Sequence, residues 1–115
     1  MARVKRGVVS HRKHKKLLGL NKGYRGTKSK LIRVAHEAAL HAGEYAFAGR
    51  RNKKRDFRRL WIVRISEATK VEGLSYSKFI NGLKKNKIGL DRKILADLVL
   101  NDPETFKKIV EQVRA

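Results

Sequence analysis

The chain has no cysteine, a single proline at position 103, and only 10 acidic residues among 115. The absence of cysteine excludes a disulfide framework and cysteine-based zinc or thiol chemistry. No stretch approaches the roughly 20 apolar residues that a membrane-spanning helix needs. The N-terminal sequence also lacks an apolar run of roughly seven or more residues, so we expect no secretory signal. Its Arg-rich, acid-poor start resembles a transit peptide, but the basic character continues far beyond that length and argues against one.

Basic residues are abundant instead, with 30 Lys and Arg and a formal net charge of +20. Self-repulsion on this scale opposes compaction, so the charge indicates a polyanionic partner, either nucleic acid or an anionic membrane. Residues 1–59 hold 19 cations and three acids, a net of +16, whereas residues 60–115 hold 11 cations and seven acids, a net of +4. We therefore expect a partner-facing part over residues 1–59 and an ordinary helical domain over residues 60–115.

The first segment, residues 1–26, is predicted to be an extended or partly helical arm. Four glycines interrupt it, namely Gly7, Gly19, Gly23 and Gly26. The run 10–20 can form one or two helical turns, but it has too few apolar residues to be buried independently. Order in this arm is therefore expected to come with the partner.

A long helix is predicted to begin at Thr27 or Ser29, either of which is a suitable N-cap, and to continue to residue 71. A bend is expected near Gly49, because glycine weakens a helix interior. At 1.5 Å per residue the segment 29–71 would be roughly 65 Å long, too long to be buried against so small a domain, so most of it should protrude. Its narrow face of small residues consists of Leu31, Ala35, Ala38, Ala39, Ala42 and Ala46.

Three short helices are predicted after Gly73, which ends the long helix. Ser75, Asp91 and Asp102 are their N-caps, and Pro103 occupies the first position of the last one. Their apolar positions recur at helical spacing. They are Tyr76, Phe79, Ile80 and Leu83, then Ile94, Leu95, Leu98 and Val99, and finally Phe106, Ile109, Val110 and Val113. The fold class is therefore all-α, with a basic N-terminal arm and long protruding helix followed by a small C-terminal helical bundle.

The densest cationic cluster lies at residues 50–59, where seven of ten side chains are Lys or Arg. Helical spacing places four of them in one stripe that can follow a phosphate backbone: Arg51, Lys54, Arg55 and Arg58. The alternative is a solvated face, but Asp56 is the only acid nearby to compensate the charge. Trp61 has two interpretations, stacking on a base or packing in the core, and its spacing from Phe57 and Ile65 favours the core.

Smaller groups of candidate binding residues lie elsewhere. The KGYRG segment at 22–26 allows close backbone approach to a partner while Tyr24 stacks. The end of the first short helix and the start of the second carry further cations, and we expect these to converge at one corner. Stabilisation of the helix dipole is an alternative reason for them. The candidate nucleic-acid contacts are Arg3, Lys5, Arg6, Arg12, Lys13, His14, Lys15, Lys16, Lys22, Tyr24, Arg25, Lys28, Lys30, Arg33, Arg50, Arg51, Lys53, Lys54, Arg55, Arg58, Arg59, Lys84, Lys85, Arg92 and Lys93.

Catalytic and metal chemistry are disfavoured throughout the sequence. His11 and His14 have metal-ligand spacing, but no carboxylate lies near them and the surrounding cations repel a divalent ion. Glu37 and His41 form an ordinary i, i+4 helix pair. The sequence contains no nucleophile–base pair and no phosphate-binding loop of the Gly-Lys-Ser type. We expect no enzyme activity, no cofactor and no small-molecule substrate.

Several segments together resemble the large-subunit ribosomal protein family "L-twenty" of bacteria and organelles, over essentially the whole chain. They are MARVKRGV, HKK at 14–16, KGYRG, AFAGRRNKKRDFRRLWIVRI, YSKFINGLKK and DRKILADL. The RDFRRLWIVRI stretch is highly specific. The chain departs from the family pattern at Ser66, where asparagine is common.

The resemblance implies a structural constituent of the large ribosomal subunit that binds large-subunit ribosomal RNA and joins assembly early. It implies that residues 1–59 are embedded in RNA, that residues 60–115 form a helical RNA-binding domain, and that neighbouring ribosomal proteins are partners. Some members also bind their own messenger RNA. The expected location is the ribosome in the cytoplasm, with an organellar ribosome as the alternative.

Two other functions are less well supported by the residues, and we expect no membrane partner. A DNA-compacting protein would account for the charge, but the sequence shows no dimeric DNA-binding fold. A membrane-active helix would need a broad Leu, Phe and Trp face, which residues 50–59 lack.

Overall fold

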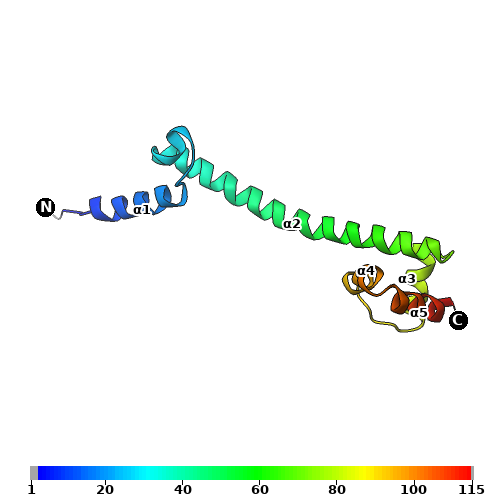
Figure 1. Ribbon diagram of the computed structural model, residues 1–115. Coiled ribbons are helices and arrows are strands. Elements are labelled where there is room, and N and C mark those ends of the chain that lie inside the picture. The colour runs from blue at the N-terminus through cyan, green and yellow to red at the C-terminus, as the bar shows by residue number, and fades with distance from the viewer. Residues whose placement is uncertain (1–2, 115) are drawn as a thin grey trace. The chain divides into compact units, whose positions relative to one another are not determined.

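The computed structural model describes residues 3–114, and within that range it contains helices and no strand (Figure 1). The elements are α1 (Gly7–Leu20), the 3-10 helix η1 (Gly26–Ser29), α2 (Ile32–Val71), α3 (Tyr76–Lys85), α4 (Arg92–Asn101) and α5 (Pro103–Arg114). The predicted all-α class, with a long helix ahead of a small bundle, is confirmed. The chain forms two compact units, Met1–Arg51 and Asn52–Ala115, and the boundary falls within α2. Met1 and Ala2, where the predicted arm begins, lie outside the described residues.

Helix α1 is longer than the sequence predicted. It begins at Gly7 and spans 14 residues, roughly four turns, where one or two turns were expected from position 10 onward. Leu17 and Leu18 are half-buried, and the other described residues of the helix are exposed. The prediction was wrong because it weighed only apolar burial, whereas Lys, Arg and Leu are intrinsically good helix formers.

The start of α2 also differs from the prediction, because neither Thr27 nor Ser29 is its N-cap. Both residues belong to η1, which begins at Gly26 with its left-handed backbone at φ +65°. The Thr27 carbonyl accepts hydrogen bonds from the Lys30 and Leu31 amides at 3.0 and 2.9 Å. The chain therefore makes a tight turn first, and α2 begins only at Ile32.

Asn21 closes the corner between α1 and α2 in the first unit. Its side chain is fully buried, and its Nδ2 donates hydrogen bonds to the carbonyls of Lys28, at 3.2 Å, and of Ala35. Ala35 is buried as well, so one residue of the small-residue face of α2 packs here. That face is only partly used, because Ala38, Ala39 and Ala42 are half-buried whereas Leu31 and Ala46 are exposed.

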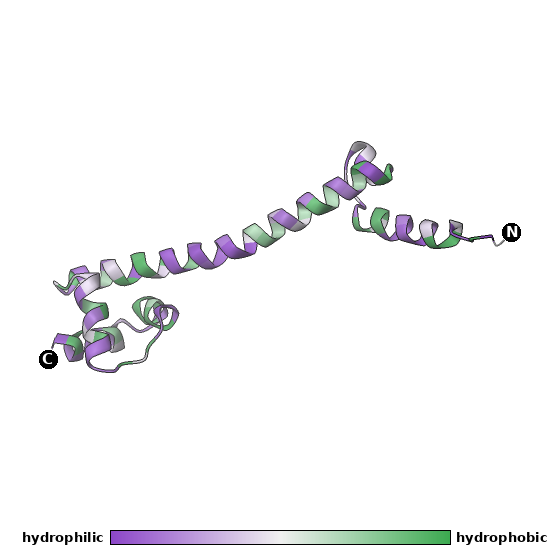
Figure 2. Ribbon diagram, turned by 180° about the vertical axis from the view of Figure 1, so that it is seen from behind, coloured by the Kyte–Doolittle hydropathy of each residue, from purple (hydrophilic) through white to green (hydrophobic). Residues whose placement is uncertain are grey.

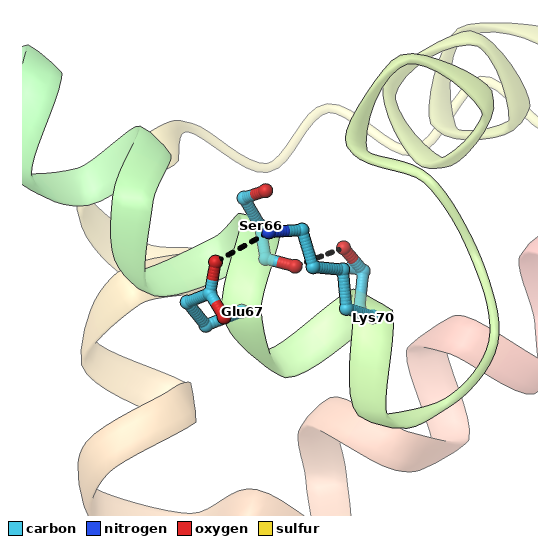
Figure 3. A network of polar contacts seen from close by, with 4 residues as sticks. Ser66, Glu67 and Lys70 are labelled. Carbon is cyan, nitrogen blue, oxygen red and sulfur yellow. Dashed lines mark hydrogen bonds and ion pairs between the residues drawn. The ribbon is translucent and has the colours of Figure 1, made fainter.

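Helix α2 ends at a Schellman motif built on Gly73, as predicted. Gly73 has φ +72°, its amide donates to the Lys70 carbonyl at 2.8 Å, and the Leu74 amide donates to the Thr69 carbonyl at 2.9 Å. Figure 3 shows the preceding turn, where Lys70 pairs with Glu67 at 2.7 Å and the Ser66 carbonyl accepts from the Thr69 hydroxyl at 3.0 Å. The glycine ends the helix because it adopts a backbone conformation that side-chain-bearing residues disfavour.

The second unit has one apolar core, contributed by the end of α2 and by α3, α4 and α5. The buried side chains are Ile65, Phe79, Leu83, Leu95, Ala96, Phe106, Ile109 and Val110. The Phe79 and Phe106 rings lie 5.7 Å apart at a tilt of 49°. Trp61 is partly buried against this core, so the packing interpretation of the tryptophan is confirmed. Ile94 was predicted to be buried, but its side chain is exposed, with a relative exposure of 46%.

Two of the three predicted N-caps make the expected side-chain hydrogen bonds. Asp91 Oδ1 accepts from the Ile94 amide at 2.8 Å, and Asp102 Oδ1 accepts from the Thr105 amide at 3.1 Å. Ser75 occupies the N-cap position of α3 without a capping bond from its side chain. The starts of α4 and α5 are therefore fixed by local chemistry, whereas α3 is positioned mainly by burial of Phe79 and Leu83.

Candidate nucleic-acid interface

The middle of α2 is a helical segment with no buried side chain. Every residue over 43–60 is exposed, and Figure 2 shows a mostly hydrophilic stretch in the middle of the long helix. Helices in proteins are stabilised mainly by packing of one apolar face. This segment packs no such face, and seven of its residues between 50 and 59 are cations. Its surface is consequently available to a polyanion.

Local compensation of this charge is small. Asp56, the one acid between positions 45 and 66, lies 3.5 Å from Arg59, and both side chains are well exposed. Exposed pairs of this kind contribute only about 0–1 kcal/mol. The Arg51 guanidinium lies over the Phe47 ring, 5.0 Å from its centroid, which orients the arginine without neutralising it. The seven cations of residues 50–59 therefore far outnumber the single acid that lies among them.

The basic residues of the first unit are likewise exposed. Arg3, Lys5 and Arg6 precede α1, and the others lie along α1 and around η1 up to the first turn of α2. These exposed residues are Arg12, Lys13, His14, Lys15, Lys16, Lys22, Arg25, Lys28, Lys30 and Arg33. Tyr24 differs from them because it is half-buried and lines a hollow next to α2. Its stacking on a base stays a prediction.

The cations of the second unit do not all meet at one corner. Lys84 and Lys85 lie in the last turn of α3. Arg92 Nε instead donates a 2.9 Å hydrogen bond to the hydroxyl of Tyr76, which lies in the first turn of α3. The predicted convergence is therefore wrong for Arg92, because its side chain lies near the opposite end of the helix. Lys93 is exposed one residue further on.

One further cation of this unit lines a hollow and is not among the predicted contacts. Arg64 is half-buried and lines a hollow with Trp61 and Lys93, at the place where α2 meets α4 within the second unit. Its position three residues after Trp61 is the signal that could have identified it, because helix residues three apart lie on neighbouring parts of the surface.

The histidines and acids of the first unit form ordinary surface contacts. His41 Nδ1 lies 3.7 Å from Glu44, so the partner of His41 is Glu44 rather than the predicted Glu37. Its ring also stacks on Tyr45, with centroids 6.2 Å apart. Across residues 3–114, no three His, Asp or Glu side chains are grouped as metal ligands would be, and no helix is both long and apolar enough to cross a bilayer.

An all-helical chain with a small apolar bundle and a fully exposed, densely cationic helix segment is typical of proteins that are embedded in nucleic acid. The sequence profile of the family described as Ribosomal protein L20 matches residues 3–109. The chain belongs to this family, whose members are structural, non-enzymatic ribosomal proteins.

Full-length relatives agree with this assignment. The large ribosomal subunit protein bL20 of Roseiflexus sp. (strain RS-1) is 58% identical over 99% of this chain and 97% of its own length. The proteins of the same name from Psychrobacter cryohalolentis and Chloroflexus aurantiacus (strain ATCC 29366) are each 55% identical over the whole chain, covering 98% and 97% of their own lengths. The family resemblance drawn from the sequence motifs is thus confirmed.

Proposed function

We propose that this protein is a structural constituent of the large ribosomal subunit that binds large-subunit ribosomal RNA directly. It supports early assembly of the subunit by neutralising and bridging RNA helices. The exposed cationic segment of α2 carries the proposal, because seven of its residues between 50 and 59 are cations and all seven are exposed. The ribosome is the location that this function gives the chain.

The energetic basis is release of counterions from RNA. Each phosphate that a Lys or Arg neutralises frees condensed cations, so binding should weaken steeply as salt rises. RNA helices that pack closely repel one another, and a cationic helix between them reduces that repulsion. Specificity should come from RNA shape and 2′-hydroxyl contacts, because side chains cannot read the deep, narrow major groove of A-form RNA.

The two parts of the chain have different roles in this proposal. Residues 60–115 recognise an RNA surface as a folded domain, and residues 1–59 then lie along phosphates. The apolar core of the second unit supports this order, since it is complete without RNA. Neighbouring large-subunit proteins are further partners in the same particle.

Salt dependence tests the proposal directly. Replacing Arg51, Arg55 and Arg58 together by alanine should lower affinity for large-subunit ribosomal RNA. It should also flatten the slope of log K against log salt by about 2–3, one unit or slightly less for each lost phosphate contact. Titrations of RNA binding at four or more salt concentrations measure the slope.

A matched variant controls for net charge. Alanine at Lys78, Lys107 and Lys108 also removes three positive charges, at exposed positions of α3 and α5 that are not among the candidate RNA contacts. The slope should then change by less than about one unit. Equal slopes for both triple variants would mean that the α2 segment does not contact RNA.

Binding of the chain's own messenger RNA is part of the proposal, because a surface that recognises RNA shape binds any transcript presenting that shape. Competition against labelled ribosomal RNA separates the ligands. The messenger leader should compete, whereas duplex DNA of equal length should compete poorly. Strong competition by the duplex would favour the DNA-compacting alternative.

A further inference from the structure

A hollow of about 440 Å³ lies in the first unit, and aromatic side chains surround it. Tyr24 comes from the segment before η1, and His41 and Tyr45 come from successive turns of α2. The His41 and Tyr45 rings are nearly parallel, 25° apart, with centroids separated by 6.2 Å. Val34 and Ala38 add an apolar wall. Flat aromatic surfaces of this kind are where proteins stack unpaired nucleobases.

The same hollow contains an acid that has no partner among residues 3–114. Residues 1–59 hold only three acids. Glu44 pairs with His41 at 3.7 Å, and Asp56 pairs with Arg59 at 3.5 Å. Glu37 lines the hollow and is exposed, and no hydrogen bond or ion pair occupies its carboxylate within the described chain. Both of its oxygens can therefore accept hydrogen bonds from a ligand.

This acid excludes some ligands and favours others. A phosphate is disfavoured beside Glu37 because the two negative charges repel. A nucleobase carries N–H donors on its edge, and the carboxylate can accept them. Lys28, which also lines the hollow, provides a positive charge for the phosphate attached to that base.

We propose that this hollow binds an unpaired guanine of the RNA. Its ring stacks on the aromatic side chains, and its N1–H and N2–H groups donate to the two oxygens of Glu37. The inference rests on the proposed function, because the guanine belongs to the ribosomal RNA. It adds that one site on the chain recognises base identity as well as shape.

Guanine is favoured over the other bases by its donor pattern. Its Watson–Crick edge presents two adjacent donors, N1–H and the N2 amino group, which match the two oxygens of a carboxylate. Adenine and cytosine present one amino group next to an acceptor nitrogen, and uracil presents one N–H between two carbonyls. Those acceptors would face the carboxylate and repel it.

Chemical probing of the complex tests the site. Large-subunit ribosomal RNA would be treated with kethoxal, which modifies N1 and N2 of unpaired guanine, and with dimethyl sulfate, which modifies adenine N1 and cytosine N3. The unaltered protein should protect at least one unpaired guanine from kethoxal. The E37Q and Y45L variants should each lose that protection and bind the RNA on the order of 10-fold more weakly, with the rest of the footprint unchanged. Glu37 and Tyr45 are both exposed, so neither change removes a buried side chain from the first unit, although Y45L also removes the surface stacking contact with His41.

A control variant and separate outcomes distinguish failure of the guanine site from failure of RNA binding as a whole. The E67Q variant removes an exposed acid elsewhere on α2 and should keep the protection and the affinity. A footprint without any guanine sensitive to Glu37 would overturn the guanine site while leaving RNA binding intact. Protection of an adenine or cytosine in place of guanine would also overturn it. Absence of any footprint would overturn the proposed function itself.

Discussion

At residue 82 the lack of a side chain is what allows α5 to approach α3. A Cβ built on Gly82 would lie 2.3 Å from Val113 Cγ1 and 3.2 Å from the Val113 carbonyl oxygen. The carbonyl cannot move without shifting α5, so we predict that Gly82→Ala lowers the free energy of unfolding by about 1–3 kcal/mol. Urea denaturation of the whole chain, followed by Trp61 fluorescence, measures this change.

Gly89 provides the control in the same unit. No heavy atom lies within 4 Å of a Cβ at that position, and its φ is not left-handed. Gly89→Ala should change the unfolding free energy by less than about 1 kcal/mol, toward greater stability. Similar losses in both variants would show that the contact with Val113 is not the cause.

Lys87 is the one non-glycine residue among positions 3–114 with a positive φ, at 55°. It follows α3 in a Schellman motif, with its amide bonded to the Lys84 carbonyl and the Ile88 amide bonded to the Leu83 carbonyl. Since side chains disfavour this conformation, Lys87→Gly should raise the unfolding free energy by about 0.5–1 kcal/mol. Gly73→Ala, at the equivalent position after α2, should lower it by a similar amount. A shift of the urea midpoint in the same direction for both variants would contradict the account.

At the scale of elements, the start of α5 depends on an ionised carboxylate. The side-chain hydrogen bond from Thr105 lowers the pKa of Asp102 below its ordinary value of 3.8, and the Thr105 amide and the charge of Lys108 act in the same direction. A lowered pKa in the folded state means that this stabilisation is complete above roughly pH 4. It is lost as the pH falls through the folded-state pKa.

Asp102→Asn tests this dependence because asparagine keeps the cap but cannot titrate. Its urea midpoint should fall less between about pH 5 and pH 2 than that of the unaltered protein. The two proteins should converge at the acid end of the range. Parallel pH profiles would mean that Asp102 does not contribute through its charge.

The sequence predicted helices well where local chemistry decides them. Asp91 and Asp102 were identified as caps and Gly73 as a helix end, because each acts through its own side chain or backbone. The start of α2 was missed because the position of η1 depends on contacts distant in sequence. Chief among these is Asn21, buried while donating to the carbonyls of Lys28 and Ala35. Asparagine is usually exposed, and no local sequence pattern predicts that Asn21 is fully buried.

The candidate site was predictable to a similar extent. The cationic segment of α2 is visible as composition, and the exposure of residues 43–60 agrees with it. The hollow next to Tyr24 was not visible, because it needs a tyrosine before η1 to approach residues of α2. The sequence predicted only an ordinary helix pair between Glu37 and His41, because it does not show that Glu37 lies beside Tyr24. Surface charge follows from sequence alone, whereas concave sites need tertiary contacts.

At the scale of the whole molecule, the charge distribution and the distribution of buried residues are complementary. The part with a net charge of +16 has few buried side chains, and the part with +4 contains the apolar core. The surplus positive charge of residues 1–59 can be balanced only by a negatively charged partner. This distribution supports the proposal that folded ribosomal RNA contacts residues 1–59.

Cross-linking of the protein to RNA in growing cells, followed by sequencing of the bound RNA, tests this central claim most directly. Small-subunit ribosomal RNA is the natural reference, because it is present in nearly equal number and has the same charge density. We predict strong enrichment of large-subunit over small-subunit ribosomal RNA, with cross-linked peptides drawn from residues 1–59. Equal recovery of the two RNAs, or cross-links confined to residues 60–115, would contradict the account.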